Sequence, residues 1–112
     1  RMWTRRVDLY ICEPMANGFR YAEGLGMFKD RMYTAPEAAD GLKGLAQNRL
    51  EWLNSIMADG RAFIGGADIS LADVLLFCMI NFFSGVGQPL NEDFTHVAAW
   101  FGRMKERPSA AA

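Results

Sequence analysis

The sequence feature that most constrains the fold is a serine and an aspartate three residues apart, directly ahead of an apolar block, in "IGGADISLADVLLF", residues 64–77. With Ser70 at the N-cap of a helix, its hydroxyl can accept the N–H of Asp73, and the Asp73 carboxylate can accept the N–H of Ser70. From residue 74 to 83 only Asn81 is polar. We therefore predict a helix that starts at Ser70, is apolar all round and forms the buried centre of the domain.

Two helical segments precede this one, because apolar residues recur at steps of three and four along them. The first runs from residue 1 to about 24 and should bend at Pro14, which lacks a backbone N–H. The second begins with a capping box of Thr34 and Glu37 and ends near Gly60. Its core face is predicted to hold Leu42, Leu45, Ala46, Leu50, Leu53, Ile56 and Met57.

The last helix is predicted from about Thr95 to Arg107, where Pro108 ends it. Trp52 and Trp100 lie beside the apolar faces, so we expect both to pack in the core. With no convincing alternating strand pattern between the four segments, the predicted fold class is all-α, a helical bundle.

Composition excludes several classes of protein and partner. The 112 residues fit one domain that buries roughly 65% of its unfolded surface. The 12 basic and 13 acidic residues nearly cancel, which argues against a nucleic-acid partner.

Cys12 and Cys78 form no Cys-x-x-Cys pair and have only His96 as a third soft ligand, so we expect no metal site and a reducing, cytoplasmic location. The run "VLLFCMINFF" is too short for a membrane span.

Ser70 and Asp73 could in principle be a nucleophile with its acid, but no histidine lies nearby in the sequence to act as base. The capping role is reason enough for both residues. His96, near the start of the last helix, is interpreted as a polar surface or capping residue. The sequence thus predicts a structural box and no catalytic residue.

Two segments together resemble a known family. "FIGGADISLADVLLF" followed by "VAAWFGRMKERPSA" is similar to the C-terminal helical domain of cytosolic glutathione S-transferases, in which a Ser/Thr-x-x-Asp box opens the central helix and a Trp-containing helix ending in Arg-Pro follows. "MWTRRVDLYICEPMANGFRYAEG" resembles the long bent first helix of that domain, in a bacterial style. Order and spacing agree along nearly all of residues 1–112.

The resemblance implies that a second, thioredoxin-like domain is missing. That domain would hold most of the glutathione site and the residue that stabilises the thiolate. The chain begins at Arg1 with no initiator methionine, which also favours a fragment. The parent would be a cytoplasmic, homodimeric detoxification enzyme that joins glutathione, as co-substrate, to a small electrophile or performs a related reduction. The fragment alone is expected to be inactive.

By the same resemblance, the first helix would line part of the electrophile pocket and of the dimer interface. Tyr10, Glu13, Asn17 and Arg20 step by three or four residues and so fall on one stripe of this helix. They are the predicted substrate-binding residues. The alternative is an ordinary solvated face.

Two other interpretations stay open. One is a non-catalytic helical module of the transferase type that serves protein association. The other is a plain bundle of four or five helices in which the motifs are coincidental. A thioredoxin-like segment upstream of Arg1 would favour the enzyme over both.

Overall fold

The computed structural model describes residues 2–21 and 36–107. Within these ranges the chain forms helices and loops and no strand, with one isolated bridge between Phe63 and Gly66, which confirms the all-α prediction. The elements, in chain order, are α1 (Met2–Val7), the π-helical segment η1 (Asp8–Cys12), α2 (Glu13–Tyr21), the 3-10 turn η2 (Pro36–Ala38), α4 (Ala39–Ile56), the 3-10 turn η3 (Met57–Asp59), α5 (Leu71–Ser84) and α6 (Thr95–Lys105).

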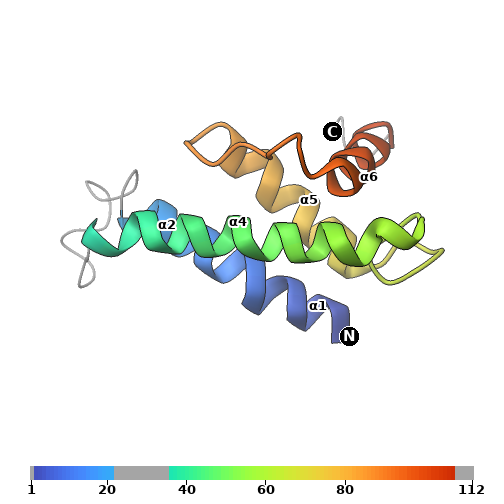
Figure 1. The fold of residues 1–112 in the computed structure, drawn as a ribbon, viewed down its shortest axis with the longest axis horizontal. Helices are drawn as coiled ribbons and strands as arrows, with labels where there is room; N and C mark the ends of the chain where they lie inside the picture. The colour runs from blue at the N-terminus through green and yellow to red at the C-terminus, as the bar shows by residue number, and fades with distance from the viewer. Residues whose placement is uncertain (1, 22–35, 108–112) are drawn as a thin grey trace.

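The run from α1 to α2 lies against both α4 and α5, as Figure 1 shows. α1 packs on α5, α2 packs on α4, and η1 contacts both of these helices. α6 packs on the end of α4 that leads into η3. The first helical run thus connects α4 with α5, and α6 joins the bundle through α4 and η3.

The bend predicted at Pro14 takes the form of a π-helical turn just before the proline. In η1 the N–H of Glu13 bonds to the carbonyl of Asp8, five residues back. In a regular α-helix the carbonyl of Tyr10 would need the N–H that Pro14 lacks, and the proline ring would crowd that carbonyl. The wider turn relieves both problems, so the helix continues to Tyr21.

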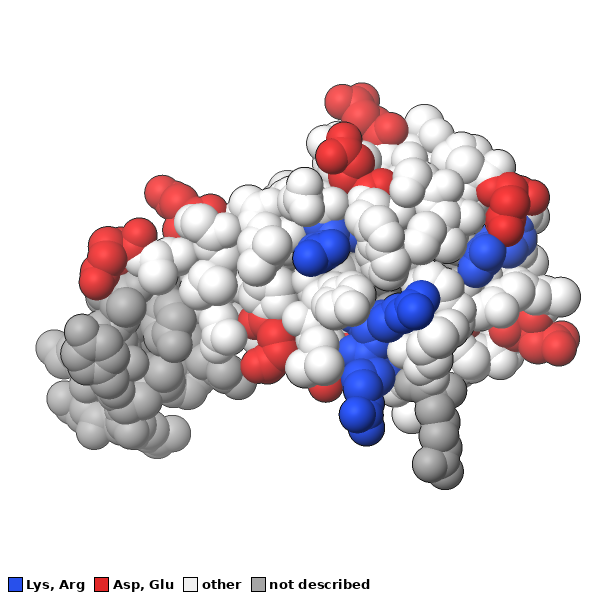
Figure 2. All heavy atoms as spheres, turned by 60° about the horizontal axis from the view of Figure 1, so that its bottom comes forward, with Lys and Arg blue, Asp and Glu red and all other residues white. Residues whose placement is uncertain are grey.

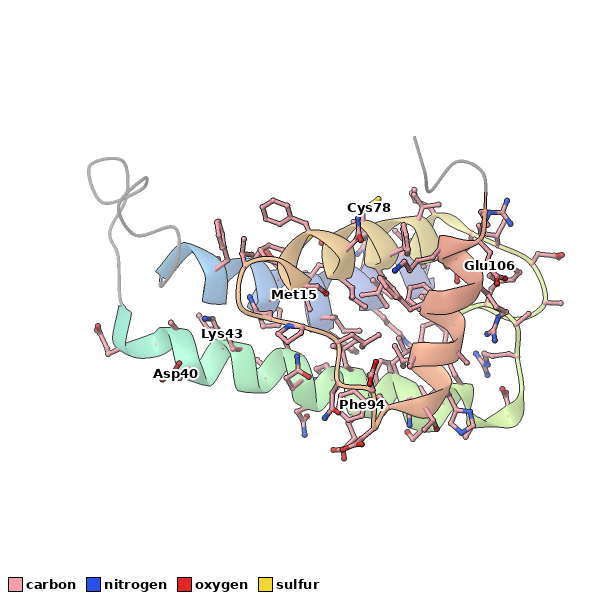
Figure 3. The ribbon with its side chains drawn as sticks, turned by 90° about the horizontal axis from the view of Figure 1, so that it is seen from above. Met15, Asp40, Lys43, Cys78, Phe94 and Glu106 are labelled. Carbon is pink, nitrogen blue, oxygen red and sulfur yellow. The ribbon has the colours of Figure 1, made fainter. Side chains whose placement is uncertain are left out.

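A close approach of α2 to α4 depends on Gly18. A Cβ at this position would lie 2.8 Å from Cγ of Lys43, on the side of α4 that faces α2 (Figure 3). Because real Cβ atoms do not come so close to another carbon, the glycine lets the two helices pack backbone to backbone.

The core draws on every main helix and agrees in most positions with the predicted faces. Trp100 is fully buried, as expected, whereas Trp52 is half-buried. The prediction is wrong for Leu45, which is 45% exposed because it lies at the edge of the α4 face. The large apolar side chains that are fully buried are those of Val7, Ile11, Met15, Leu50, Leu53, Ile64, Leu76, Ile80, Val97 and Trp100.

α5 differs from its prediction in one respect. It is not buried all round: Leu71 is 67% exposed, Val74 44% and Phe82 57%. The described helices cover only one side of α5, the side that carries Asp73, Leu76 and the other buried residues. The outer side of this apolar helix therefore faces solvent in the chain as described.

The helix ends follow ordinary capping rules where the structure describes them. α4 passes through η3 to Gly60, whose φ of 87° is the left-handed conformation of a C-terminal glycine. Thr34, the predicted cap at the other end, lies outside the described residues. The start of α6 is capped by a distant side chain: Oδ1 of Asn54 accepts the N–H groups of His96 at 2.8 Å and Val97 at 3.1 Å. Among the described helices, none is both long and apolar enough to cross a membrane.

Candidate functional site

The box at the start of α5 centres on the buried carboxylate of Asp73, with Ser70 at its exposed edge. Ser70 and Asp73 form the capping box, and Oδ2 of Asp73 accepts both the N–H and the hydroxyl of Ser70 at 2.9 Å. Oδ1 accepts the backbone N–H of Ile64 at 2.9 Å and the indole N–H of Trp100 at 2.8 Å. Asp73 is completely buried. Its carboxylate thus ties the loop before α5 and the middle of α6 to the first turn of α5.

This arrangement has no capacity for acid–base chemistry. Four donors already occupy the carboxylate oxygens of Asp73, and a general base needs a free lone pair within reach of a substrate proton. The Ser70 hydroxyl donates its proton to Asp73, and within the described residues it forms no hydrogen bond with a histidine. His96 is exposed on α6, where its backbone bonds to Asn54. The structure therefore shows Ser70 and Asp73 as a capping box, and their lack of a catalytic role stays a prediction.

A second polar region lies where α1 and η1 face α4 and the loop after η3. We call it the aromatic–arginine cluster; it comprises Trp3, Arg6, Tyr10, Arg49, Trp52 and Arg61. Tyr10 is 38% exposed, and its ring meets that of Trp52 edge to face with centroids 5.6 Å apart. The guanidinium carbon of Arg49 lies 5.0 Å from the centre of the Tyr10 ring. Tyr10 is thus held between an indole and a cation.

Trp3 forms the other half of the cluster. Its ring lies 6.0 Å from that of Trp52, and Arg6 and Arg61 stand over it at 5.1 and 5.9 Å. Arg61 is anchored by Asp59, whose carboxylate accepts its guanidinium N–H groups at 2.9–3.2 Å. The hydrogen bonds from Arg61 hold the pKa of the Asp59 carboxyl below its usual value. The N–H groups of Arg61 are thus engaged by Asp59 and by the carbonyl of Ile64, whereas Arg6 is oriented by its contact with the Trp3 ring.

The predicted stripe of Tyr10, Glu13, Asn17 and Arg20 is only partly visible. Tyr10 lies in the cluster, Glu13 is exposed, and Asn17 is half-buried and has a polar or ring partner. The backbone of Arg20 lies in α2, but its side chain lies outside the described part. The π turn separates Tyr10 from the other three, so its direction no longer follows α-helical spacing. Their role in substrate binding stays a prediction.

Two hollows border α1. One, of about 240 Å³, is lined by Met2, Arg5, Arg6, Leu9 and Tyr10. The other, of about 590 Å³, lies between α1 and α5 and is lined by Met2, Thr4, Arg5, Asp8, Leu71 and Leu75. Lys and Arg side chains gather on the face over the α1 region in Figure 2. In the smaller hollow, the apolar lining beside Arg5 and Arg6 suits a ligand that combines an apolar body with a negative group; the larger hollow has both Arg5 and Asp8 at its margin.

Sequence reasoning missed most of these residues. The sequence shows Arg5 and Arg6 only as two neighbouring basic residues, and it indicates for Trp3 only an apolar position in a helix. Arg49 and Arg61 gave no signal, because their partners are 39 and 58 residues away in the sequence, Tyr10 and Trp3 respectively. Only the tertiary packing of η1 on α4 brings these groups together.

The cysteines differ in exposure. Burial, with smaller effects from the Asp8 and Glu13 carboxylates, raises the pKa of the Cys12 thiol to about 12. A thiol with this pKa is protonated at neutral pH and is a poor nucleophile. Cys78 is exposed on α5. In the described part of the chain, no three His, Cys, Asp or Glu side chains come together in a way that could hold a metal ion.

Comparison with known proteins gives a consistent picture. The sequence model of the family "Glutathione S-transferase, C-terminal domain" matches residues 36–103. The chain is 25% identical over 109 residues to glutathione S-transferase 2 of Saccharomyces cerevisiae, covering 96% of this chain and 46% of that protein.

Two solved structures share the fold, each with a TM-score of 0.84 over 96% of this chain. One is Gtt2 from Saccharomyces cerevisiae, 24% identical, of which 51% is covered. The other is a glutathione S-transferase domain-containing protein from Marinobacter aquaeolei, 23% identical, of which 52% is covered. The chain thus spans about half the length of these relatives. The bacterial character expected from the first helix stays a prediction, since a yeast protein is among the relatives.

Proposed function

Because the family match covers more than half of it, the chain belongs to the glutathione S-transferase C-terminal domain family, and we propose that it is the helical half of a glutathione S-transferase. The observation that carries the proposal is that the family model matches residues 36–103, which contain Asp73 and its partners, and that solved transferase structures share the fold of the same region. The relatives are about twice as long as this chain, which leaves room for a second domain that holds glutathione. We propose a thioredoxin-like domain in that place.

In the proposed reaction the thiolate sulfur of glutathione attacks an electrophilic carbon. A carbon–sulfur bond forms, the bond to the leaving group breaks, and the leaving group departs with the electron pair. Neither Cys12, which is buried and protonated, nor Asp73, whose carboxylate already accepts four hydrogen bonds, is proposed to activate the thiol. Activation is therefore assigned to the second domain.

The contribution proposed for this chain is one wall of the electrophile pocket. Support comes from Tyr10, whose partly exposed ring is fixed by Trp52 and Arg49 beside a hollow of about 240 Å³. A rigid aromatic surface can stack on a planar electrophile at little entropic cost. Glu13, Asn17 and Arg20 are proposed to extend this wall along α2. The same helical run is proposed to contribute to a homodimer interface in a cytoplasmic enzyme.

The test is turnover by the full-length parent protein. We expect it to conjugate glutathione to an aromatic halide, and we expect residues 1–112 alone to show neither conjugation nor tight glutathione binding in calorimetry. Sedimentation of the parent should give the mass of a homodimer. A dimeric parent that binds no glutathione would instead support the non-catalytic association module. Micromolar glutathione binding by the 112-residue chain would refute the assignment of the glutathione site to a second domain.

A further inference from the structure

We propose that the smaller hollow beside α1 selects aromatic electrophiles that carry a carboxylate, and that Arg5 and Arg6 bind this group. The inference rests on the proposed function and goes beyond it in naming the class of electrophile that the pocket wall accepts. The carboxylate binds the two guanidinium groups and takes no part in the bonds that form and break. The glutathione thiolate attacks the ring carbon that bears a halogen, and the halide leaves with the electron pair.

The lining of the smaller hollow combines apolar surface with positive charge. Met2, Leu9 and Tyr10 line it together with Arg5 and Arg6. All five residues come from the continuous run of α1 and η1. Met2, Leu9 and Tyr10 are exposed, so their side chains are available to a ligand instead of filling the core. A ring that lies on this surface would have two arginines beside it.

The size of the hollow limits its ligand to a small molecule. The volume of about 240 Å³ is below the roughly 300–1,000 Å³ of pockets that hold drug-sized ligands. A single aromatic ring with short substituents suits this space better than a fused polycyclic body. The partly exposed ring of Tyr10 is held in place by Trp52 and Arg49, so a ligand ring can pack against it without first ordering the tyrosine.

Arg5 and Arg6 supply the charge that favours an acidic ligand. Within the described residues neither guanidinium forms an ion pair with a carboxylate. Arg6 is oriented by Trp3, whose ring centre lies 5.1 Å from its guanidinium carbon, and Arg5 is exposed. The planar fork of N–H donors on a guanidinium matches the two oxygens of a carboxylate. Two such groups at one hollow therefore favour an acid over a neutral amide of the same shape.

The nearby acidic residues do not cancel this charge at the smaller hollow. Asp8 lines the larger hollow, which Arg5 also borders. Glu13 is exposed in the first turn of α2, beyond Tyr10. Among the described residues, the lining of the smaller hollow carries two cations and no anion. Figure 2 shows the basic side chains that gather on this face, although the net charge of the chain is only −1.

Two electrophiles that differ in charge test the inference in the full-length parent. A chloronitrobenzoate and the corresponding chloronitrobenzamide share the ring, the leaving group and the carbon that is attacked. With glutathione at saturation, kcat/KM would be measured for each compound and divided by the rate of its uncatalysed reaction with glutathione. We expect this normalised kcat/KM to be about tenfold higher for the acid, as one good hydrogen-bonded charge contact provides.

Matched variants assign the preference to the two arginines. The double variant Arg5→Gln, Arg6→Gln should abolish it, and Arg5→Gln alone, at an exposed position, should lower the acid-to-amide ratio severalfold. Arg6→Lys keeps the charge but loses the planar fork, so an intermediate ratio is expected. Arg107→Gln makes the same change at an exposed arginine after α6 and should leave the ratio as in the unsubstituted parent.

Ionic strength gives a second measure of the same contact. The acid-to-amide ratio should fall between about 0.1 M and about 1 M salt, because the Debye length shortens from about 10 Å to about 3 Å. A ratio that stays constant over this range would contradict binding of the acid by the exposed Arg5.

The remaining outcomes separate the selectivity from the proposed function. Turnover of both compounds with equal normalised kcat/KM would overturn the selectivity and keep the proposed function. An unchanged acid-to-amide ratio with a raised KM for glutathione in the arginine variants would also overturn it, because the arginines would then bind the carboxylates of glutathione.

If the parent turns over neither compound, calorimetry with the same two compounds decides. Binding of the acid but not of the amide, lost in the double variant, would support recognition of an acid at the hollow and refute the proposed activity. Equal binding of the two compounds, or binding of neither, would overturn both.

Discussion

The Asp73 network and the aromatic–arginine cluster are both polar regions, yet they are built in opposite ways. Asp73 is fully buried, and four donors within 2.9 Å occupy its carboxylate. In the cluster, Tyr10 is partly exposed, and Arg6 and Arg49 lie over aromatic rings; within the described residues neither guanidinium forms an ion pair with a carboxylate. A polar group whose hydrogen-bonding capacity is fully used stabilises one structure. A polar group that is held in place but still has unused donors can recognise a ligand. The sequence motif marks the first region, and binding is proposed at the second.

The largest effect should follow from Asp73→Ala. The change leaves the Ile64 amide and the Trp100 indole N–H buried without an acceptor, so we expect the free energy of unfolding to fall by about 3–5 kcal/mol. This exceeds the ~1 kcal/mol typical of a lost cap, because the carboxylate also binds α6. Urea unfolding of the variant provides the measurement. A variant that kept its stability yet lost turnover in the full-length enzyme would show that Asp73 is catalytic.

Ser70→Ala should have a smaller effect. It removes the hydroxyl that caps α5 but leaves the Ser70 N–H bound to Asp73, so a loss of about 1 kcal/mol is expected. Ser55→Ala is the matched control, since Ser55 is an exposed serine near the end of α4 that bonds only to the carbonyl of Trp52. Equal losses in the two variants would mean that the cap contributes nothing specific.

Within the aromatic–arginine cluster, Arg49→Leu should cost about 0.5 kcal/mol. The substitution keeps an apolar stem against Tyr10 and removes the cation over its ring, a contact of modest strength at a partly exposed position. This loss in the free energy of unfolding is measured by comparing the thermal unfolding of the variant with that of the unsubstituted protein. A loss as large as that of Ser70→Ala would place this cluster among the stabilising regions and weaken the contrast with the Asp73 network.

The smallest change in stability is expected for Tyr10→Phe and Arg20→Ala. Both should change the free energy of unfolding by less than about 0.5 kcal/mol, while kcat/KM toward an electrophile falls by about fivefold in the full-length enzyme. Lys105→Ala, at an exposed position on α6, serves as a control that should leave kcat/KM unchanged. Unchanged kcat/KM in both test variants would make the predicted stripe an ordinary solvated face.

Local chemistry explains what the sequence could predict. The start of α5, the stop at Gly60 and the disturbance before Pro14 each depend on residues within five positions of one another. The exposed outer face of α5 could not be predicted, because periodicity shows that a helix is apolar but not how many neighbours cover it. The cluster around Tyr10 could not be predicted either, because it depends on the packing of α4 against η1. In addition, a wide π turn has no clear apolar period that the sequence could reveal.

The capping of α6 by Asn54 has a consequence for the order of folding. α5 carries its own cap in Ser70 and Asp73, so its first turn can form from local contacts alone. The first N–H groups of α6 find their acceptor on α4, 42 and 43 residues earlier in the chain. Such a contact closes a long loop and gains nothing until α4 is in place. We therefore expect α6 to form after α4, and Asn54 to show a low φ-value in folding kinetics.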